Sequence, residues 1–165
     1  MNSSDLRGVG LSEEDFKKGN VIFNIDHPKL EYSWDAGIAI SRYLQELKNG
    51  RLIARKCCQC KRIMIPPRMF CEMCFRETDE WVYVKDTGTV NTFSLCYVTW
   101  DMQWVKKPQI PAVIEIDGAS KGMGILHHLK VDPKKAKTGL RVKAVWKKAG
   151  EREGSITDLM YFEPL

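Results

Sequence analysis

Two cysteine pairs constrain this chain more than any other feature. Cys57 and Cys60 form one Cys-x-x-Cys pair, and after ten residues Cys71 and Cys74 form a second. Each pair can place two thiolates on one tight turn, and two such turns that face each other make a tetrahedral cage of four sulfurs. Metal binding of this kind contributes about 10–16 kcal/mol to folding. The spacing therefore predicts a structural zinc site with these four cysteines as its ligands.

Other chemistries use the same residue types. A rubredoxin-like iron site has four cysteine ligands, and a reactive dithiol also uses Cys-x-x-Cys. A closed cage leaves no open coordination position for a substrate, so a structural role is favoured. Cys58 would pair with Cys60 only at the poorer Cys-x-Cys spacing, and we interpret it as a non-ligand. Cys96 stands alone and is expected to be a small core residue.

Length and composition indicate an ordinary globular protein. The 165 residues suffice for one domain, or for two small ones that share a core. Hydrophobic residues make up 44% and charged residues 28%, which argues against wholesale disorder. No apolar run reaches the roughly 18 residues of a membrane span, and the first ten residues lack a signal-peptide core. We therefore expect a cytoplasmic protein with no membrane partner.

The net charge of +5 conceals two basic blocks on an acidic background. Residues 51–76 hold seven Lys/Arg and one Glu, and residues 130–148 hold eight Lys/Arg and one Asp. Four thiolates with one Zn²⁺ add two negative charges, so the first block carries about +4 when metal is bound. This distribution indicates an anionic partner without identifying it.

The hydrophobic pattern changes along the chain. Residues 33–50 are predicted to form a helix that Ser33 caps and Gly50 closes, because apolar residues recur there at three- and four-residue steps. Residues 51–80 are too short and too polar a stretch to fold by burial alone. Residues 81–165 alternate with period two in several runs, which predicts five or six short strands and a small barrel. The predicted segment boundaries are 1–50, 51–80 and 81–165.

Several motifs follow one another in a definite order. They are Tyr32-x-Trp34-x-x-Gly37, Leu47-x-x-Gly50-x-Leu52, Arg55-Lys56-Cys57-Cys58-Gln59-Cys60, Ile65-Pro66-Pro67-Arg68, Cys71-x-x-Cys74, Glu80-Trp81-Val82, Gly88-Thr89-Val90, and Asp132-Pro133 with Gly139-Leu140-Arg141-Val142. Over about residues 31–150 the chain resembles a family of zinc-ribbon plus OB-fold proteins long catalogued as a domain of unknown function. Pro-Pro-Arg between the cysteine pairs and Gly-Thr-Val after them make the resemblance specific. Lys61 departs from it, because the family usually has Gly after the second cysteine.

The resemblance implies a mainly β fold with N-terminal α structure. Its parts would be a helical N-terminal arm, a rubredoxin-like zinc ribbon and a five-stranded OB-fold barrel. It also implies an acyl-CoA role, because members look like accessory subunits of thiolases and of lipid-transfer proteins. Some relatives bridge an acetoacetyl-CoA thiolase and a hydroxymethylglutaryl-CoA synthase, and others pair with hydratases or aldolases in steroid breakdown. The expected partners are thus a thiolase-like enzyme, with or without such a synthase, and an acyl-CoA ligand.

The chemistry of coenzyme A fits the basic ribbon independently of the resemblance. Its pyrophosphate and 3′-phosphate suit a patch of Arg and Lys, and its long pantetheine arm needs a groove between elements. The candidates for phosphate contact are Lys61, Arg62 and Arg68, at the junction of ribbon and barrel. The alternative is that each of these is simply a solvated charge.

Residues 99–108 form a predicted loop that is rich in large apolar groups. Trp100, Met102 and Trp104 are candidates for a partner-docking surface or an acyl-lining lid. The equal alternative is that this loop folds over one end of the barrel. His127 and His128 sit in a strand pattern that puts one ring inside and one outside, and a packed or solvent-facing role is favoured over a catalytic base.

The sequence supports one leading functional hypothesis and two others. The leading hypothesis is a non-catalytic, zinc-stabilised subunit of an acyl-CoA enzyme complex that binds acyl-CoA or bridges a thiolase-type enzyme and its partner. The competitor is a single-stranded nucleic-acid-binding protein, because Arg141, Lys143 and Lys147 would share one strand face of an OB barrel. A stand-alone enzyme or redox carrier has little support in the sequence.

Overall fold

The computed structural model describes residues 12–19, 29–33, 35–99 and 101–165. The chain divides into two compact units, residues 1–34 and 35–165. In the first unit, α1 (Glu13–Lys18) is a short helix that begins with a capping box between Ser12 and Asp15 and ends at Gly19. Within the described ranges, no helix is both long enough and apolar enough to cross a membrane.

The second unit begins with helix α2 (Gly37–Lys48), which starts four residues later than predicted. The proposed cap at Ser33 is wrong: the N-cap is Ala36, and the Asp35 carboxylate accepts a hydrogen bond from the Gly37 amide at 2.9 Å. Of the apolar residues that recur at three- and four-residue steps in the predicted helix, Tyr43 and Leu47 are buried, whereas Ile40 is exposed. This buried face packs on strand β1 (Leu52–Lys56) and orients the ribbon that follows.

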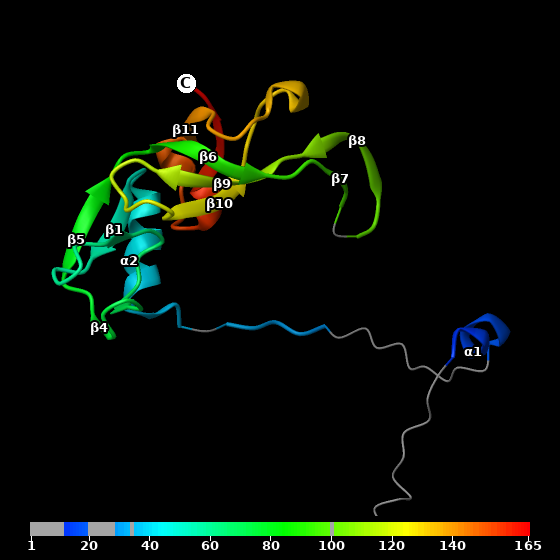
Figure 1. Ribbon diagram of the computed structural model, residues 1–165, viewed down its shortest axis with the longest axis horizontal. Helices are drawn as coiled ribbons and strands as arrows, with labels where there is room; N and C mark the ends of the chain where they lie inside the picture. The colour runs from blue at the N-terminus through cyan, green and yellow to red at the C-terminus, as the bar shows by residue number, and fades with distance from the viewer. Residues whose placement is uncertain (1–11, 20–28, 34, 100) are drawn as a thin grey trace, which may run out of the picture. The chain divides into compact units, whose positions relative to one another are not determined.

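The cysteine-bearing segment folds around a small antiparallel sheet. Its strand order is β2-β1-β5, where β2 is Ile63–Met64 and β5 is Glu80–Val84. A second, two-stranded ladder pairs β3 (Phe70–Cys71) with β4 (Arg76–Glu77). These short ladders bring the two cysteine pairs together, and Figure 1 shows β4 at one end of the unit.

The rest of the unit is a five-stranded antiparallel sheet in the order β10-β9-β6-β11-β12. Its strands are β6 (Thr87–Phe93), β9 (Pro111–Ile116), β10 (Gly124–His128), β11 (Arg141–Trp146) and β12 (Leu159–Pro164). The predicted alternation holds in β9, where Ala112, Ile114 and Ile116 are buried. Gly88 and Gly124 stand where neighbouring strands approach closely, since a Cβ at either would lie 2.3 Å from a backbone oxygen of β9.

The prediction of a closed five-stranded barrel is wrong in one respect. The mainly β fold and the five strands are present, but the sheet is open between its edge strands β10 and β12. They meet through a single parallel bridge between Leu129 and Phe162, with the Lys130 amide donating to the Phe162 carbonyl at 2.8 Å. Past that bridge the chain turns into the short helix η2 (Pro133–Lys135), so no ladder can extend.

Two insertions interrupt the five-stranded sheet. Between β6 and β9, strands β7 (Cys96–Val98) and β8 (Trp104–Gln109) form a hairpin that projects from the sheet (Figure 1). Between β11 and β12, the chain passes through η3 (Ala149–Glu151) and η4 (Ile156–Asp158).

The ribbon and the five-stranded sheet share one hydrophobic core. The buried cluster runs from Leu47 of α2 through Ile53 of β1 to Ile114 and Phe162 of the large sheet. Hydrogen bonds also cross between the two parts, because the Ile63 amide donates to the Ser120 hydroxyl at 2.8 Å and the Ser120 amide donates to the Ile63 carbonyl at 3.0 Å. The metal-binding end is therefore attached firmly to the sheet.

Candidate functional site

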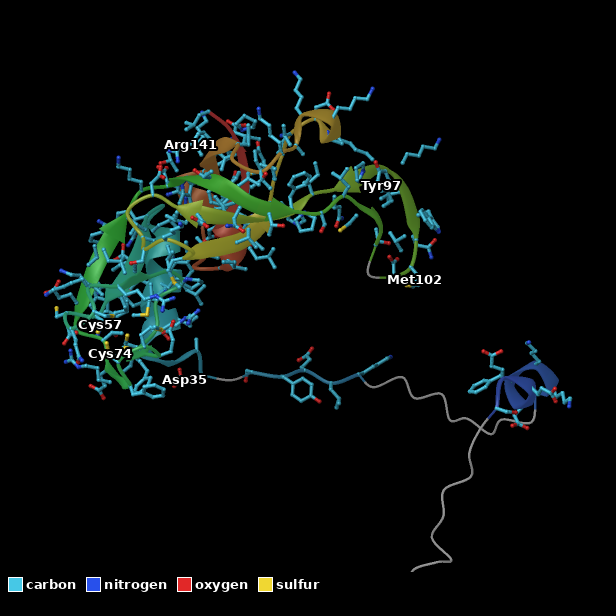
Figure 2. The ribbon with its side chains drawn as sticks, in the orientation of Figure 1. Asp35, Cys57, Cys74, Tyr97, Met102 and Arg141 are labelled. Carbon is cyan, nitrogen blue, oxygen red and sulfur yellow. The ribbon has the colours of Figure 1, made fainter. Side chains whose placement is uncertain are left out.

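The four predicted metal ligands lie together. The sulfurs of Cys57, Cys60, Cys71 and Cys74 are all within 4.8 Å of one another, and Cys60 Sγ lies 3.6 Å from Cys71 Sγ. Four sulfurs each about 2.3 Å from a central zinc ion would be separated by about 3.8 Å. Cys57 and Cys71 are fully buried, and Cys60 reaches the surface. Figure 2 shows Cys57 and Cys74 at the end of the unit that carries β4.

The two cysteine turns share a left-handed residue directly after the second cysteine. The residue that follows each pair, Lys61 or Phe75, adopts a left-handed conformation with φ of 63° and 51°, respectively. The turns are closed by backbone bonds from the Cys57 amide to the Arg62 carbonyl and from the Phe75 amide to the Cys71 carbonyl, both 2.9 Å. Lys61 therefore occupies a conformation that glycine adopts freely, and glycine is the residue that the resemblance led us to expect at this position.

The electrostatics of the sulfur cluster suit a divalent cation. The backbone amides of Cys60 and Gln59 point at the Cys57 sulfur and help lower its pKa to about 7, against the opposing effect of burial. Burial raises the pKa of Cys74 to about 12, and the sulfurs of Cys60, Cys57 and Cys71 add to the rise. Four such close thiols release their protons together only when a cation compensates the charge. The donor set therefore fits zinc, which would close the ribbon without an open coordination position.

The two remaining cysteines lie outside this cluster. The Cys58 amide donates to the Asp79 carboxylate at 2.6 Å, and its thiol donates to Glu80 at 3.1 Å. Cys58 thus takes a position beside the cage, as the spacing predicted. The prediction for Cys96 is wrong, because it lies partly buried on the β7–β8 hairpin rather than in the core.

The three candidates for phosphate contact surround the ribbon, but two of them already have a partner. Arg62 and Arg68 both pair with Glu72, at 2.9 and 3.4 Å, while Lys61 is exposed. One carboxylate thus offsets part of the positive charge that the sequence suggested for this face. The assignment of these residues to coenzyme A stays a prediction.

The candidates on the predicted loop lie on the projecting hairpin. Met102 and Trp104 are 78% and 81% exposed, so neither folds over the end of the sheet. Thr99 fixes the hairpin turn, since its amide donates to the Gln103 carbonyl at 2.9 Å and its hydroxyl accepts from the Gln103 amide at 3.1 Å. Figure 2 places Tyr97 and Met102 on this arm, far from the cysteines. Trp100 lies outside the described residues.

Sequence reasoning missed two hollows beside the open edge of the large sheet. One has a volume of about 780 Å³ and is lined by Lys107, Lys130 and Tyr161 among others. The second, of about 410 Å³, is lined mainly by apolar side chains such as Leu126 and Met160. An apolar residue at the outward position of a half-buried strand, as Leu126 is, was the available signal.

His127 and His128 line these hollows. His127 is half-buried with its ring edge-on to Phe162, and His128 is exposed, as the strand alternation predicted. Burial lowers the pKa of His127. Its Nδ1 accepts a hydrogen bond from the His128 amide at 2.9 Å, so the ring is held as part of the wall.

Comparisons with known proteins agree with this architecture. Residues 44–80 match the family model described as "ChsH2, rubredoxin-like zinc ribbon domain", and residues 81–147 match "ChsH2, C-terminal OB-fold domain". No curated protein matches the chain. The zinc prediction is confirmed by the ribbon match together with the four clustered cysteines.

Two solved structures are similar in fold. One is a Sulfolobus solfataricus protein of unknown function from the DUF35 family, 23% identical, with a TM-score of 0.59 over 74% of this chain and 82% of that chain. The other is described as "Ltp2-ChsH2(DUF35) aldolase", 20% identical, with a TM-score of 0.56 over 84% of this chain and 98% of that chain.

The second structure corrects one expectation. We expected a protein that is no enzyme, but a chain of this fold occurs in a structure named as an aldolase. The fold therefore does not exclude a part in catalysis, and the expectation of a non-enzyme is corrected. Because consecutive family models cover the zinc ribbon and the OB-fold domain from residue 44 to residue 147, the chain belongs to the ChsH2 family.

Proposed function

We propose that the protein is an accessory subunit of an acyl-CoA enzyme complex, which docks on a thiolase-like partner through its β7–β8 hairpin and holds acyl-CoA beside that partner. The observation that carries the proposal is the hairpin itself. Its turn is held by hydrogen bonds, yet it presents Met102 and Trp104 almost fully to water. Large apolar side chains on an ordered projection are typical of the central contacts of protein interfaces.

The backbone of the hairpin strengthens this interpretation. Met102 has φ of 63°, a left-handed conformation that is unfavourable for a residue with a side chain. The fold thus accepts both a strained backbone and an exposed thioether at one position. A binding partner that covers the Met102 side chain would explain why the fold retains both the strained backbone and the exposed thioether. The Ltp2-ChsH2 aldolase structure, whose name joins two proteins, supports the same kind of role.

The charge pattern of the OB-fold domain weighs against the nucleic-acid alternative. Arg141 pairs with Asp117 at 2.5 Å, Lys143 with Glu163 at 3.5 Å, and Lys147 with Asp158 at 3.6 Å. A surface that binds a phosphate backbone needs cations that are free to replace counterions. The strand face that suggested nucleic acid is thus occupied by internal ion pairs.

The test is affinity capture with the full chain in its native host, followed by identification of the captured proteins. We expect a thiolase-like acyl-CoA enzyme, alone or with a hydroxymethylglutaryl-CoA synthase. The double variant Met102→Ser/Trp104→Ser should capture at least 10-fold less of this enzyme. The matched control is Ile38→Ser, a similarly exposed apolar residue on α2. Capture that survives the hairpin variant would reject the docking surface, and a partner set without any acyl-CoA enzyme would reject the function.

A further inference from the structure

The two hollows on the OB-fold domain meet. Both are lined by His128 and Met160, and both lie along the open edge between β10 and β12. Each volume, about 780 and about 410 Å³, lies within the roughly 300–1,000 Å³ typical of small-molecule sites. We call the two together the seam groove. It exists because the sheet does not close there.

One half of the seam groove is apolar. Leu126 is 68% exposed, and Met160 and Ile156 are each close to half-exposed. Three large aliphatic side chains around one hollow leave apolar surface in water, at about 25 cal/mol for each Å² that a ligand could cover. Leu159 lines the hollow from β12. This half therefore suits an alkyl or acyl chain.

The other half carries a net positive charge. Lys107 and Lys130 line it, and Lys130 is held in place by the Tyr161 ring, 4.4 Å from its ammonium nitrogen, and by the Tyr161 hydroxyl at 3.1 Å. The Asp132 carboxylate also lines this half. It accepts a hydrogen bond from the Lys134 amide at 3.0 Å and so caps η2. Because this half has two lysines and one carboxylate that already accepts a hydrogen bond, it favours a ligand with anionic oxygens.

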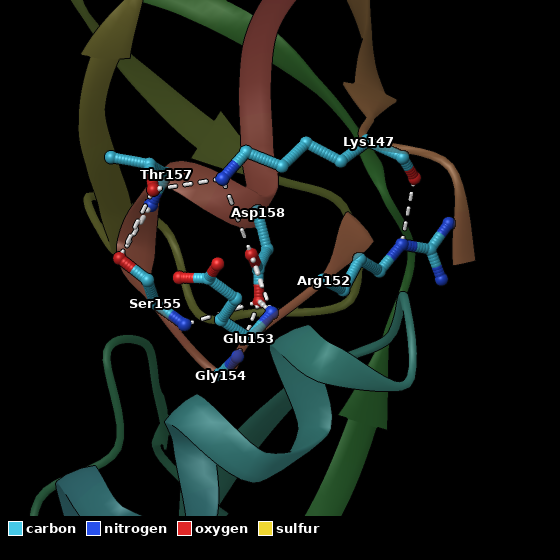
Figure 3. A network of polar contacts seen from close by, with 7 residues as sticks. All are labelled: Lys147, Arg152, Glu153, Gly154, Ser155, Thr157 and Asp158. Atoms are coloured by element: carbon cyan, nitrogen blue, oxygen red, sulfur yellow. Dashed lines mark hydrogen bonds and ion pairs between the residues drawn. The ribbon is translucent and has the colours of Figure 1, made fainter. Parts of the chain in front are cut away.

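A rigid loop forms the wall of the apolar half. Asp158 is fully buried, and its carboxylate accepts hydrogen bonds from the amides of Glu153, Gly154 and Ser155 at 2.7–3.1 Å (Figure 3). Lys147 lies 3.6 Å from the same carboxylate. These contacts fix the segment that carries Ile156 and Thr157 into the groove. The groove is thus formed before any ligand arrives, which lowers the entropic cost of binding.

We infer that the seam groove binds an amphipathic anion whose acyl chain lies against Leu126 and Met160 and whose phosphate-bearing part lies against Lys107 and Lys130. This chemistry is that of a medium-chain acyl-CoA, and the inference rests on the proposed function. It moves the ligand from the ribbon junction around Arg68 to the OB-fold domain. Lys107 belongs to β8, so a partner docked on the hairpin would lie beside the basic end.

The experiment measures binding to the zinc-loaded full chain by isothermal titration calorimetry. The probes are decanoyl-CoA, coenzyme A without an acyl group, and decanoate. Decanoyl-CoA should bind at least 10-fold more tightly than either part. Leu126→Asp should weaken the binding of decanoyl-CoA at least 10-fold and leave the affinity for coenzyme A almost unchanged. Lys107→Glu should weaken the binding of both ligands. Circular dichroism checks that each variant is folded, which is expected because both side chains are exposed.

Matched variants separate this inference from the proposed function. Arg68→Glu, on the ribbon, and Ile38→Asp, on α2, should leave the affinity for decanoyl-CoA within about twofold. If Arg68→Glu weakens binding and the groove variants do not, the groove is rejected while an acyl-CoA function stands. If decanoate binds as tightly as decanoyl-CoA, the basic half is rejected. If neither the chain nor its captured complex binds decanoyl-CoA, both the groove and the function are rejected.

Discussion

Lys61 and Phe75 hold equivalent positions, one after each cysteine pair, and both are left-handed. A side chain in this conformation costs roughly 1–2 kcal/mol because its Cβ crowds the following carbonyl oxygen. Metal binding, worth about 10–16 kcal/mol in small zinc domains, outweighs such local strain. The turn geometry is therefore imposed by the ligands rather than by the residues between them.

This strain predicts how Lys61 tolerates substitution. Lys61→Gly should leave stability unchanged or raise it by up to about 1 kcal/mol, because glycine adopts the same φ freely. Lys61→Val should lower stability by about 1–2 kcal/mol, because a β-branched residue is poorly suited to this conformation. Urea unfolding of the zinc-loaded protein measures both. Equal stability of the two variants would contradict the strain argument.

Asp158 is the second residue whose environment makes a sharp prediction. Burial would raise its pKa, but the amides of Glu153, Gly154 and Ser155, with Lys147, outweigh burial and hold the pKa below its usual range. Asp158→Ala would leave these amides without their acceptor, which should lower the free energy of unfolding by about 2–4 kcal/mol. Asp132→Ala, which removes an exposed cap, is the control and should lower it by about 1 kcal/mol at most. Equal losses for the two variants would show that the buried network has no special role.

At the scale of elements, one ion pair fastens three strands of the large sheet. Asp117 follows β9, and it accepts from Arg141 of β11 at 2.8 and 2.5 Å and from the Thr87 hydroxyl of β6 at 2.5 Å. Hydrogen bonds from Arg141 and Thr87 hold the pKa of Asp117 at about 2, although burial opposes them. The pair therefore ties β6, β9 and β11 together while Asp117 is ionised, and its contribution to stability depends on pH.

The shifted pKa gives a defined pH window. A carboxyl group with a pKa of about 3.9 when unfolded and about 2 when folded contributes stability fully above about pH 4, and that contribution is lost as the pH falls from about 4 to about 2. Asp117→Asn should thus be less stable than the parent at pH 7, and the difference should shrink below pH 4. Unfolding by urea at a series of pH values measures it. A difference that stays constant down to pH 2 would exclude the ion pair as its source.

At the scale of the whole molecule, the zinc ribbon and the OB-fold domain behave as parts of one body. Residues of α2, β1 and the large sheet share a buried cluster, and Ser120 is hydrogen-bonded to Ile63 across the two parts. Loss of the metal should therefore affect strands that carry no ligand.

Zinc removal tests this coupling. A chelator should lower the unfolding midpoint by roughly 10 °C or more and should raise amide exchange in β11 and β12 as well as in the ribbon. Cys71→Ser should reproduce the effect without chelator, and Cys58→Ser should retain about one equivalent of zinc because Cys58 lies beside the cage. Unchanged protection of β11 and β12 after zinc removal would show two independent folding units.

Much of the local structure was predictable because it depends on short-range patterns. The spacing of the four cysteines is enough to predict that they cluster. The alternation at Ala112, Ile114 and Ile116 is likewise enough to predict a strand with one buried face. The helix start was misplaced because Ser33 is a good cap by type, whereas the chain uses Asp35 and Ala36. A cap depends on where the backbone turns, and residue type alone does not report that.

What the sequence by itself determined is the metal, the mainly β character and the family, because each is encoded in spacing or in the order of motifs. Only the tertiary structure decided that the sheet stays open at β12 and that Arg141, Lys143 and Lys147 find acidic partners. It also decided that Leu126, Met160 and Lys107 line adjoining hollows. These features join residues from segments up to about fifty positions apart. Their energies arise from contacts between those segments, so no local pattern in the chain records them.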